Sequence, residues 1–214
     1  MIEINNVSIV GWEPTIRGAR NPLNSWARMD SSFDESGSLI ELGPNDQSLL
    51  SRLANAGSDH GKFMRMIVVY LDINAPLYWW KEFDTYKVGT VANSCSTMHK
   101  IHAKEFTIND FSSDQLCSGS IMFLQDFVKL LNHYRESFIS TKDKDYWWQL
   151  IQLLPSSYNQ KRTVMLNYEV LKNMYNARKS HKLDEWRDFC DWIRSLPHSY
   201  LITGVRDNEK EEQQ

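Results

Sequence analysis

The apolar residues in the second half of the chain recur at helical spacing, and this periodicity constrains the fold more than any other feature. Amphipathic helices are predicted over residues 121–138, 142–154, 163–178 and 183–196. Pro155 and Pro197 follow the second and fourth of them, where proline ends a helix because it lacks the backbone N–H. The second half of the chain is therefore expected to be rich in helix.

The first half alternates apolar runs with polar segments. Strands are predicted over residues 1–12 and 63–73, and short helices over residues 47–56 and 77–82. Asn45-Asp46 is expected to cap the first of these helices. Residues 15–46 and 84–100 are expected to be irregular, the second as a polar loop lining a cleft. Together these elements predict an α+β fold, with helices flanking a small, mostly antiparallel sheet.

The length and composition are those of one folded domain. The chain has 214 residues, of which 42% are hydrophobic and 24% charged. No linker or internal repeat interrupts it, so residues 1–206 are predicted to form a single domain. Residues 207–214 are polar and mostly charged, without apolar anchors, and are predicted to form a flexible tail.

Charge and cysteine content indicate a cytoplasmic protein that binds neither nucleic acid nor membrane. The net charge of −3 provides no general attraction for either surface. The three cysteines have no ligand spacing and suit a reducing compartment. No signal peptide is evident, and the longest apolar stretch, residues 64–71, is too short to span a bilayer. The eight Trp favour a pocket or an oligomer interface.

Residues 154–187 carry the polar side chains that suggest a binding site. The helix expected over residues 163–178 presents Asn167, Asn173 and Arg178 beside its apolar stripe. Asn167 and Arg178 are eleven residues apart, about three helical turns, and are expected on one face. An amide can pair with an imide edge, and a guanidinium can hold a phosphate or a carbonyl. The alternative is that both Asn are merely exposed and that Arg178 pairs with a nearby carboxylate.

This stretch contains, in order, a Leu-Pro loop, a helix with two Asn and a terminal Arg, a His and a Glu-x-Arg segment. The order resembles that of the flavin-dependent thymidylate synthases. The matching residues are Leu154-Pro155, Asn167, Leu171, Asn173, Arg178, His181 and Glu185-Trp186-Arg187. Upstream, the predicted helix, the segment Gly57–His60 and the predicted strand of residues 63–73 are similar to the family in a more general way.

The resemblance implies an enzyme that binds FAD and a deoxyuridine nucleotide and transfers a one-carbon unit to pyrimidine C5. It implies NADPH and a methylene-folate as co-substrates, and a homotetramer as the assembly. Arg178 would be the catalytic residue that polarises the uracil. Cofactor-binding residues would be Asn167, Asn173, His60 and His181, and substrate-binding residues would be Lys161 or Arg162, Arg178, Ser94 and Ser96.

The chain departs from the family in lacking its Arg-His-Arg signature, which would hold flavin and nucleotide phosphates. Residues 81–87 stand in the corresponding block and read KEFDTYK. Other cations would have to replace the signature, and the candidates are Lys81, Lys87, Lys100, Arg17, Arg20 and Arg28. The alternative function is therefore a non-catalytic, phage-type accessory protein that keeps the nucleotide pocket but has lost the reaction. A related enzyme acting on another pyrimidine is a third possibility.

Two further patterns carry weaker hypotheses. His99 and His102 have no neighbouring ligands at metal spacing, so a metal site is not expected. Cys95 lies between two serines and is a possible nucleophile, although the sequence places no base beside it.

Overall fold

Four strands form an antiparallel sheet in the order β1-β4-β6-β5. The bounds are Glu3–Val10 for β1, Val68–Pro76 for β4, Val91–Ser94 for β5 and Asn159–Asn167 for β6. Alternate side chains of β4 (Val69, Leu71 and Ile73) are buried, as in a strand with one face on a core. The edge strands β1 and β5 are mostly exposed. The predicted α+β class, a small antiparallel sheet flanked by helices, is confirmed.

The computed structural model describes residues 2–204, so the predicted tail at residues 207–214 lies outside the described residues. The chain divides into two compact units. Unit 1 contains the N-terminal residues through Glu3, Ile73–Thr85 and Asn93–Arg162, and unit 2 contains Ile4–Asp72, Tyr86–Ala92 and the chain from Thr163 onward. Each strand of the sheet contributes residues to both units. That residues 1–206 form one domain stays a prediction.

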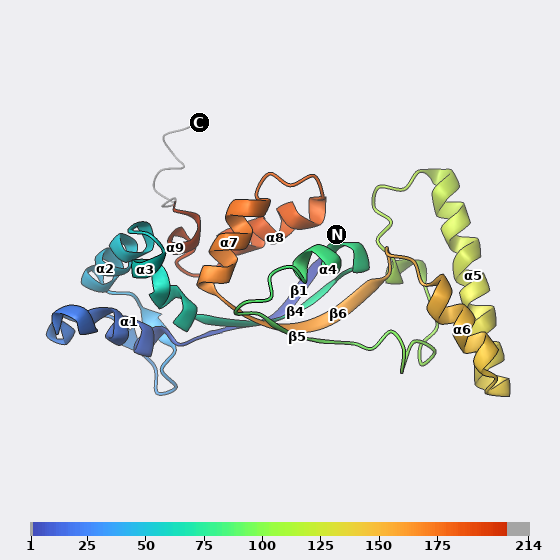
Figure 1. Cartoon of the computed structure of the whole chain (residues 1–214), viewed down its shortest axis with the longest axis horizontal. Coiled ribbons are helices and arrows are strands. Elements are labelled where there is room, and N and C mark those ends of the chain that lie inside the picture. Colours follow the sequence, from blue (N-terminus) through green and yellow to red (C-terminus); the bar gives the residue numbers. More distant parts are fainter. Residues whose placement is uncertain (1, 205–214) are drawn as a thin grey trace. The chain divides into compact units, whose positions relative to one another are not determined.

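Unit 2 contains most of the helices (Figure 1). They are α1 (Trp12–Arg20), α2 (Pro44–Asn55), α3 (Ser58–Gly61), α7 (Tyr168–Arg178), α8 (Asp184–Ser195) and α9 (Tyr200–Thr203). A hairpin of β2 (Ser32–Phe33) and β3 (Leu39–Glu41) and 3-10 turns at Asn21–Leu23, Trp26–Arg28 and Lys62–Met66 complete the unit. The apolar face of α8, with Trp186, Phe189 and Ile193, is fully buried.

Three predicted boundaries in unit 2 are wrong in part. Residues 12–20, mostly assigned to an irregular segment, form α1, whose Trp12 and Ile16 are buried. Residues 62–66 form a 3-10 turn before β4. That turn packs against Gly11, where a Cβ would lie 2.2 Å from the Met66 carbonyl oxygen. Residues 163–167 end β6 instead of starting a helix, because Val164 and Leu166 alternate inward as strand residues do.

A buried ion pair holds the segment between α1 and α2. The Arg20 and Asp46 side chains are 4% and 0% exposed, and Arg20 Nε donates to Asp46 Oδ1 over 2.7 Å. The other carboxylate oxygen accepts from the backbone N–H of Asp30 at 3.0 Å and of Ser31 at 2.9 Å. Asp46 is therefore not a helix cap, because α2 begins at Pro44 with Gly43 as its N-cap.

Unit 1 contains α4 (Leu77–Phe83), α5 (Ser118–Thr141), α6 (Lys144–Leu153) and a 3-10 turn at Ile108–Asp110. The predicted helices near residues 77–82, 121–138 and 142–154 are confirmed. Helices α5 and α6 contact each other over a core of Ile101, Phe106, Phe111, Leu124, Leu131 and Leu150. Among the helices of residues 2–204, none combines the length and apolar character needed to cross a bilayer.

Replacing Asp46 with Ala is expected to lower the free energy of unfolding by about 3–5 kcal/mol, because Arg20 would keep a buried charge without its partner. Urea denaturation monitored by circular dichroism measures this loss. The matched control is Glu13→Ala, since Glu13 forms an exposed pair with Arg17 and is expected to contribute at most about 1 kcal/mol. Equal losses for both variants would show that Asp46 does not organise this segment.

Candidate functional site

A pocket of about 290 Å³ in unit 2 lies among α2, α3 and α7, and we call it the α7 pocket. Its polar lining residues are Asn55, Ser58, Glu169, Lys172 and Asn173, and its remaining lining residues are Ala54, Gly57, Gly61 and Met64. Glu169, Lys172 and Asn173 share one face of α7 because they are spaced i, i+3 and i+4. The pocket thus brings together Asn173 and part of the segment Gly57–His60, which the sequence had indicated separately as similar to the family.

Charges in the α7 pocket are held in defined positions. Lys172 Nζ donates to the carbonyl oxygen of Ala54 over 2.6 Å, at the C-terminal end of α2. An ammonium has three protons, so one such bond leaves it able to donate to a ligand. Glu169 accepts from both Nε and Nη2 of Arg65, the latter over 3.1 Å. Glu169 is thereby neutralised, and Lys172 supplies the cation that a ligand would meet.

Asn167 caps α7 and does not lie within it. Its Oδ1 accepts from the backbone N–H of Val170 over 3.0 Å, and its side chain is buried. The extended backbone at Asn167 (φ −138°, ψ 170°) ends β6 and starts the helix. The prediction that Asn167 and Arg178 share one helical face is therefore wrong. Gly89 also packs here, because a Cβ on it would lie 3.0 Å from Asn167 Nδ2.

No protein-family model matches the sequence, and no curated protein does. Among solved structures, the chain matches two crystal structures of the flavin-dependent thymidylate synthase ThyX from Helicobacter pylori, both with FAD and dUMP. The TM-scores are 0.67 and 0.68 at 16% identity, with 94% and 95% of this chain and 98% of the ThyX chain covered in each case. The chain has the fold of the flavin-dependent thymidylate synthases. The resemblance inferred from the sequence is thus confirmed at the level of fold.

Arg178 lies at the C-terminal end of α7 against two aromatic rings, Tyr86 and Trp186, whose centroids are 6.1 Å apart. Its guanidinium carbon is 4.7 Å from the ring centroid of Trp186 and 5.7 Å from that of Tyr86. Arg178 Nε donates to the Tyr86 hydroxyl over 3.0 Å. These contacts fix the direction of the guanidinium fork. His181 lies in the turn that follows, with Nδ1 accepting from the backbone N–H of Leu183 and its ring 6.3 Å from that of Trp186.

The predicted substrate residues Lys161, Arg162, Ser94 and Ser96 belong to unit 1. Lys161 and Arg162 lie in β6 rather than in a loop. The Arg162 guanidinium lies 4.2 Å from the ring centroid of Trp80 and binds Asp84 at 2.7 Å. Its charge is therefore already paired within unit 1. Ser94 ends β5, and Ser96 Oγ accepts from two backbone N–H groups of the next turn.

Residues 81–87, the block expected to carry the signature arginines, comprise the end of the aromatic helix α4 and the segment that follows it. Trp79, Trp80 and Phe83 of α4 are buried, with ring centroids 4.9–5.1 Å apart. Trp80 Nε1 donates to the Gln160 carbonyl oxygen over 2.9 Å. Within residues 81–87, Phe83 is therefore the residue that belongs to this buried aromatic cluster. Lys81 and Lys87, two of the proposed substitutes, are exposed.

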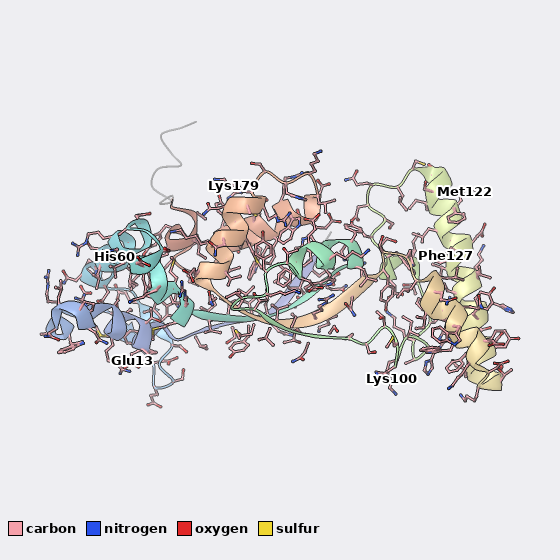
Figure 2. All side chains as sticks on the ribbon, viewed as in Figure 1. Glu13, His60, Lys100, Met122, Phe127 and Lys179 are labelled. Atoms are coloured by element: carbon pink, nitrogen blue, oxygen red, sulfur yellow. The ribbon has the colours of Figure 1, made fainter. Side chains whose placement is uncertain are left out.

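His60 lies on α3, the helical turn that supplies Ser58 and Gly61 to the α7 pocket, and its imidazole is exposed (Figure 2). The roles of His60, His181, Asn167, Asn173, Arg178, Lys161, Arg162, Ser94 and Ser96 in binding or catalysis stay predictions. Sequence reasoning missed Lys172, although it stands beside Asn173. It also missed Tyr86, because no local pattern brings a loop residue to Arg178. Within residues 2–204, no three His, Cys, Asp or Glu side chains lie together as metal ligands would.

Replacing Asn167 with Ala is expected to destabilise unit 2 by about 1 kcal/mol, because the Val170 N–H would lose its cap. Asn167→Ser retains a side-chain oxygen at the N-cap and serves as the control, with a smaller expected loss. Urea denaturation of the two variants measures the difference. Equal stability of Asn167→Ala and the unaltered protein would contradict the capping role.

Proposed function

We propose that this protein is a flavin-dependent, thymidylate-synthase-like enzyme that binds FAD and a deoxyuridine nucleotide and transfers a one-carbon unit to pyrimidine C5. The observation that supports it most directly is the likeness of fold over nearly the full length of both chains to ThyX bound to FAD and dUMP. One of the residues that carried the resemblance in the sequence, Asn173, lines the α7 pocket, and this supports the proposal.

The α7 pocket fits part of a flavin cofactor. Ligand pockets span roughly 300–1,000 Å³, so a pocket of about 290 Å³ suits one ring system and not a whole dinucleotide. Asn173 offers both a donor and an acceptor to the polar edge of a flat heterocycle, and Lys172 offers a cation to a phosphate. Bound flavin would supply the hydride for the reaction. Asn173 and Lys172 would then orient the cofactor.

Arg178 would act on the nucleotide. The rings of Tyr86 and Trp186 hold its guanidinium, and a fixed fork of donors can polarise a uracil carbonyl at little cost in side-chain entropy. By the same resemblance, NADPH and a methylene-folate would be co-substrates, and the assembly would be a homotetramer in the cytoplasm.

A second candidate function is a nucleotide-binding protein of the same fold that has lost the reaction. The block of residues 81–87 favours it, because it contains no arginine to hold flavin and nucleotide phosphates. Retention of flavin distinguishes the two candidates, since the enzyme requires it and a nucleotide trap does not.

The visible absorption spectrum, recorded before and after addition of excess FAD and desalting, tests the proposal. Retained flavin absorbance followed by conversion of dUMP to dTMP would support the enzyme. Nucleotide binding without flavin retention would favour the second candidate, and binding of neither would reject both.

The Asn173→Ala variant is expected to bind FAD about tenfold more weakly, because loss of one hydrogen bond at the flavin edge corresponds to about 1.4 kcal/mol. Fluorescence quenching of FAD on titration with protein measures the affinity. Asn176→Ala is the matched control, since Asn176 is an exposed residue of the same helix outside the pocket lining. Weaker FAD binding in both variants, or in neither, would show that the α7 pocket is not the cofactor site.

A further inference from the structure

Helix α5 of unit 1 exposes large apolar side chains in its N-terminal half, which Met122 and Phe127 mark in Figure 2. Phe123 is 74% exposed, Met122 66% and Leu130 41%. Single exposed apolar residues are ordinary on a protein surface, whereas a contiguous group of them marks an interaction site. These residues lie outside the lining of the α7 pocket, so the proposed flavin site does not account for their exposure.

A row of three side chains runs along one side of α5, and we call it the α5 face. It consists of Phe123, Phe127 and Leu130, whose spacing of i, i+4 and i+7 follows the helical period. The rings of Phe123 and Phe127 are stacked, with centroids 6.5 Å apart and planes 10° apart. Phe127 is half-buried and also packs against the core that α5 shares with α6. The α5 face is therefore an outward continuation of that core.

The charged residues beside the α5 face have opposite signs. Asp126 and Lys129 are both exposed, and their side chains pair at 2.8 Å. An exposed pair within one helix contributes little to stability, so both groups remain available to charges on another molecule. Their charges also cancel, so a second copy of this surface would meet no net repulsion here.

A two-fold, antiparallel arrangement makes the α5 face complementary to itself. In a two-fold interface, each contact between residues i and j forms twice, once in each direction. A crossing centred between residues 126 and 127 sets Phe123 opposite Leu130 of the partner subunit, because the two are equally distant from the centre. It also brings Asp126 within one turn of the partner subunit's Lys129. Helix α5 has 24 residues, about 36 Å, which is long enough for these contacts on both sides of the axis.

We propose that the α5 face is an interface between two copies of this chain, formed by antiparallel pairing of their α5 helices. Phe123, Phe127 and Leu130 form its apolar centre, and Asp126 and Lys129 pair across its rim. A second copy is the partner because the face supplies, within itself, a counterpart for each of its own apolar and charged groups. The inference goes beyond the proposed function, since it identifies a surface of association that requires neither flavin nor nucleotide.

The Phe123→Glu variant tests the apolar centre of the interface. Because each copy contributes one Phe123, the substitution places two carboxylates in every pair, and the dissociation constant is expected to rise at least about a hundredfold. Phe123 is exposed, so the variant is expected to fold, which circular dichroism checks. Analytical ultracentrifugation is expected to show that the mass of the assembly halves, at concentrations where the unaltered protein is fully associated.

Gln125→Glu is the matched control for this variant. Gln125 is an exposed residue of α5 about 200° round the helix from Phe123, so the substitution adds the same charge away from the α5 face. Its association is expected to equal that of the unaltered protein. Dissociation of both variants would show that charge on α5, and not loss of the α5 face, separates the copies, and would overturn the proposal.

A mixing experiment tests the charge pairing between copies. The Asp126→Lys chain has two cations beside the α5 face and the Lys129→Asp chain has two anions, so each is expected to associate with itself about tenfold more weakly. An equal mixture of the two sets opposite charges against each other and is expected to associate as tightly as the unaltered protein. A mixture that associates no more tightly than either variant alone would contradict pairing across the two-fold axis.

Flavin retention, measured on the same samples, separates failure of this inference from failure of the proposed function. If the unaltered protein is a monomer throughout, or if Phe123→Glu leaves the assembly intact, the α5 face is not an interface between copies. Retained flavin would in that case leave the proposed cofactor site standing. If Phe123→Glu halves the assembly but no sample retains flavin, the inference stands and the proposed enzyme falls.

Discussion

The buried cap that Asn167 forms at the end of β6 sets the position of every functional candidate on α7. Its side chain replaces the missing hydrogen bond of the first helical turn, and the Tyr168 N–H extends the sheet ladder to the Ile67 carbonyl oxygen over 3.1 Å. A helix that starts at a fixed residue presents fixed faces. Glu169, Lys172 and Asn173 therefore line the α7 pocket, and Arg178 reaches Tyr86 and Trp186 at the other end of the helix.

The cations of this chain divide between internal ion pairs and pocket walls. Several of its arginines are committed to internal partners: Arg20 to Asp46, Arg65 to Glu169 and Arg162 to Asp84. The cation that lines the α7 pocket is instead a lysine, Lys172. A lysine holds phosphate as a point charge without the planar fork of arginine. In the proposed function, phosphate would thus be held by Lys172 as a point charge.

Much of the architecture could be predicted from the sequence because long helices can be recognised by the helical spacing of their apolar residues. The bounds of α5, α6 and α8 were close to those expected. The start of α7 was not, because Val164 and Leu166 satisfy both a helical and a strand pattern, and only pairing with β4 decides between them. Likewise, the local sequence predicts Asp46 as a helix cap, but its carboxylate is bound by Arg20, which lies twenty-six residues away in the chain.

The sequence by itself determined the fold class, the helical second half and the likeness to the flavin-dependent thymidylate synthases, because each depends on local spacing of apolar and polar residues. Only the tertiary structure decided which polar residues line pockets. It assigned Asn167 to a cap and Arg162 to an internal ion pair, and it brought Lys172 to a pocket wall. The physical reason is that an amide or a cation is satisfied by whichever partner lies nearest in space, and nearness in space is set by packing between segments far apart in the chain.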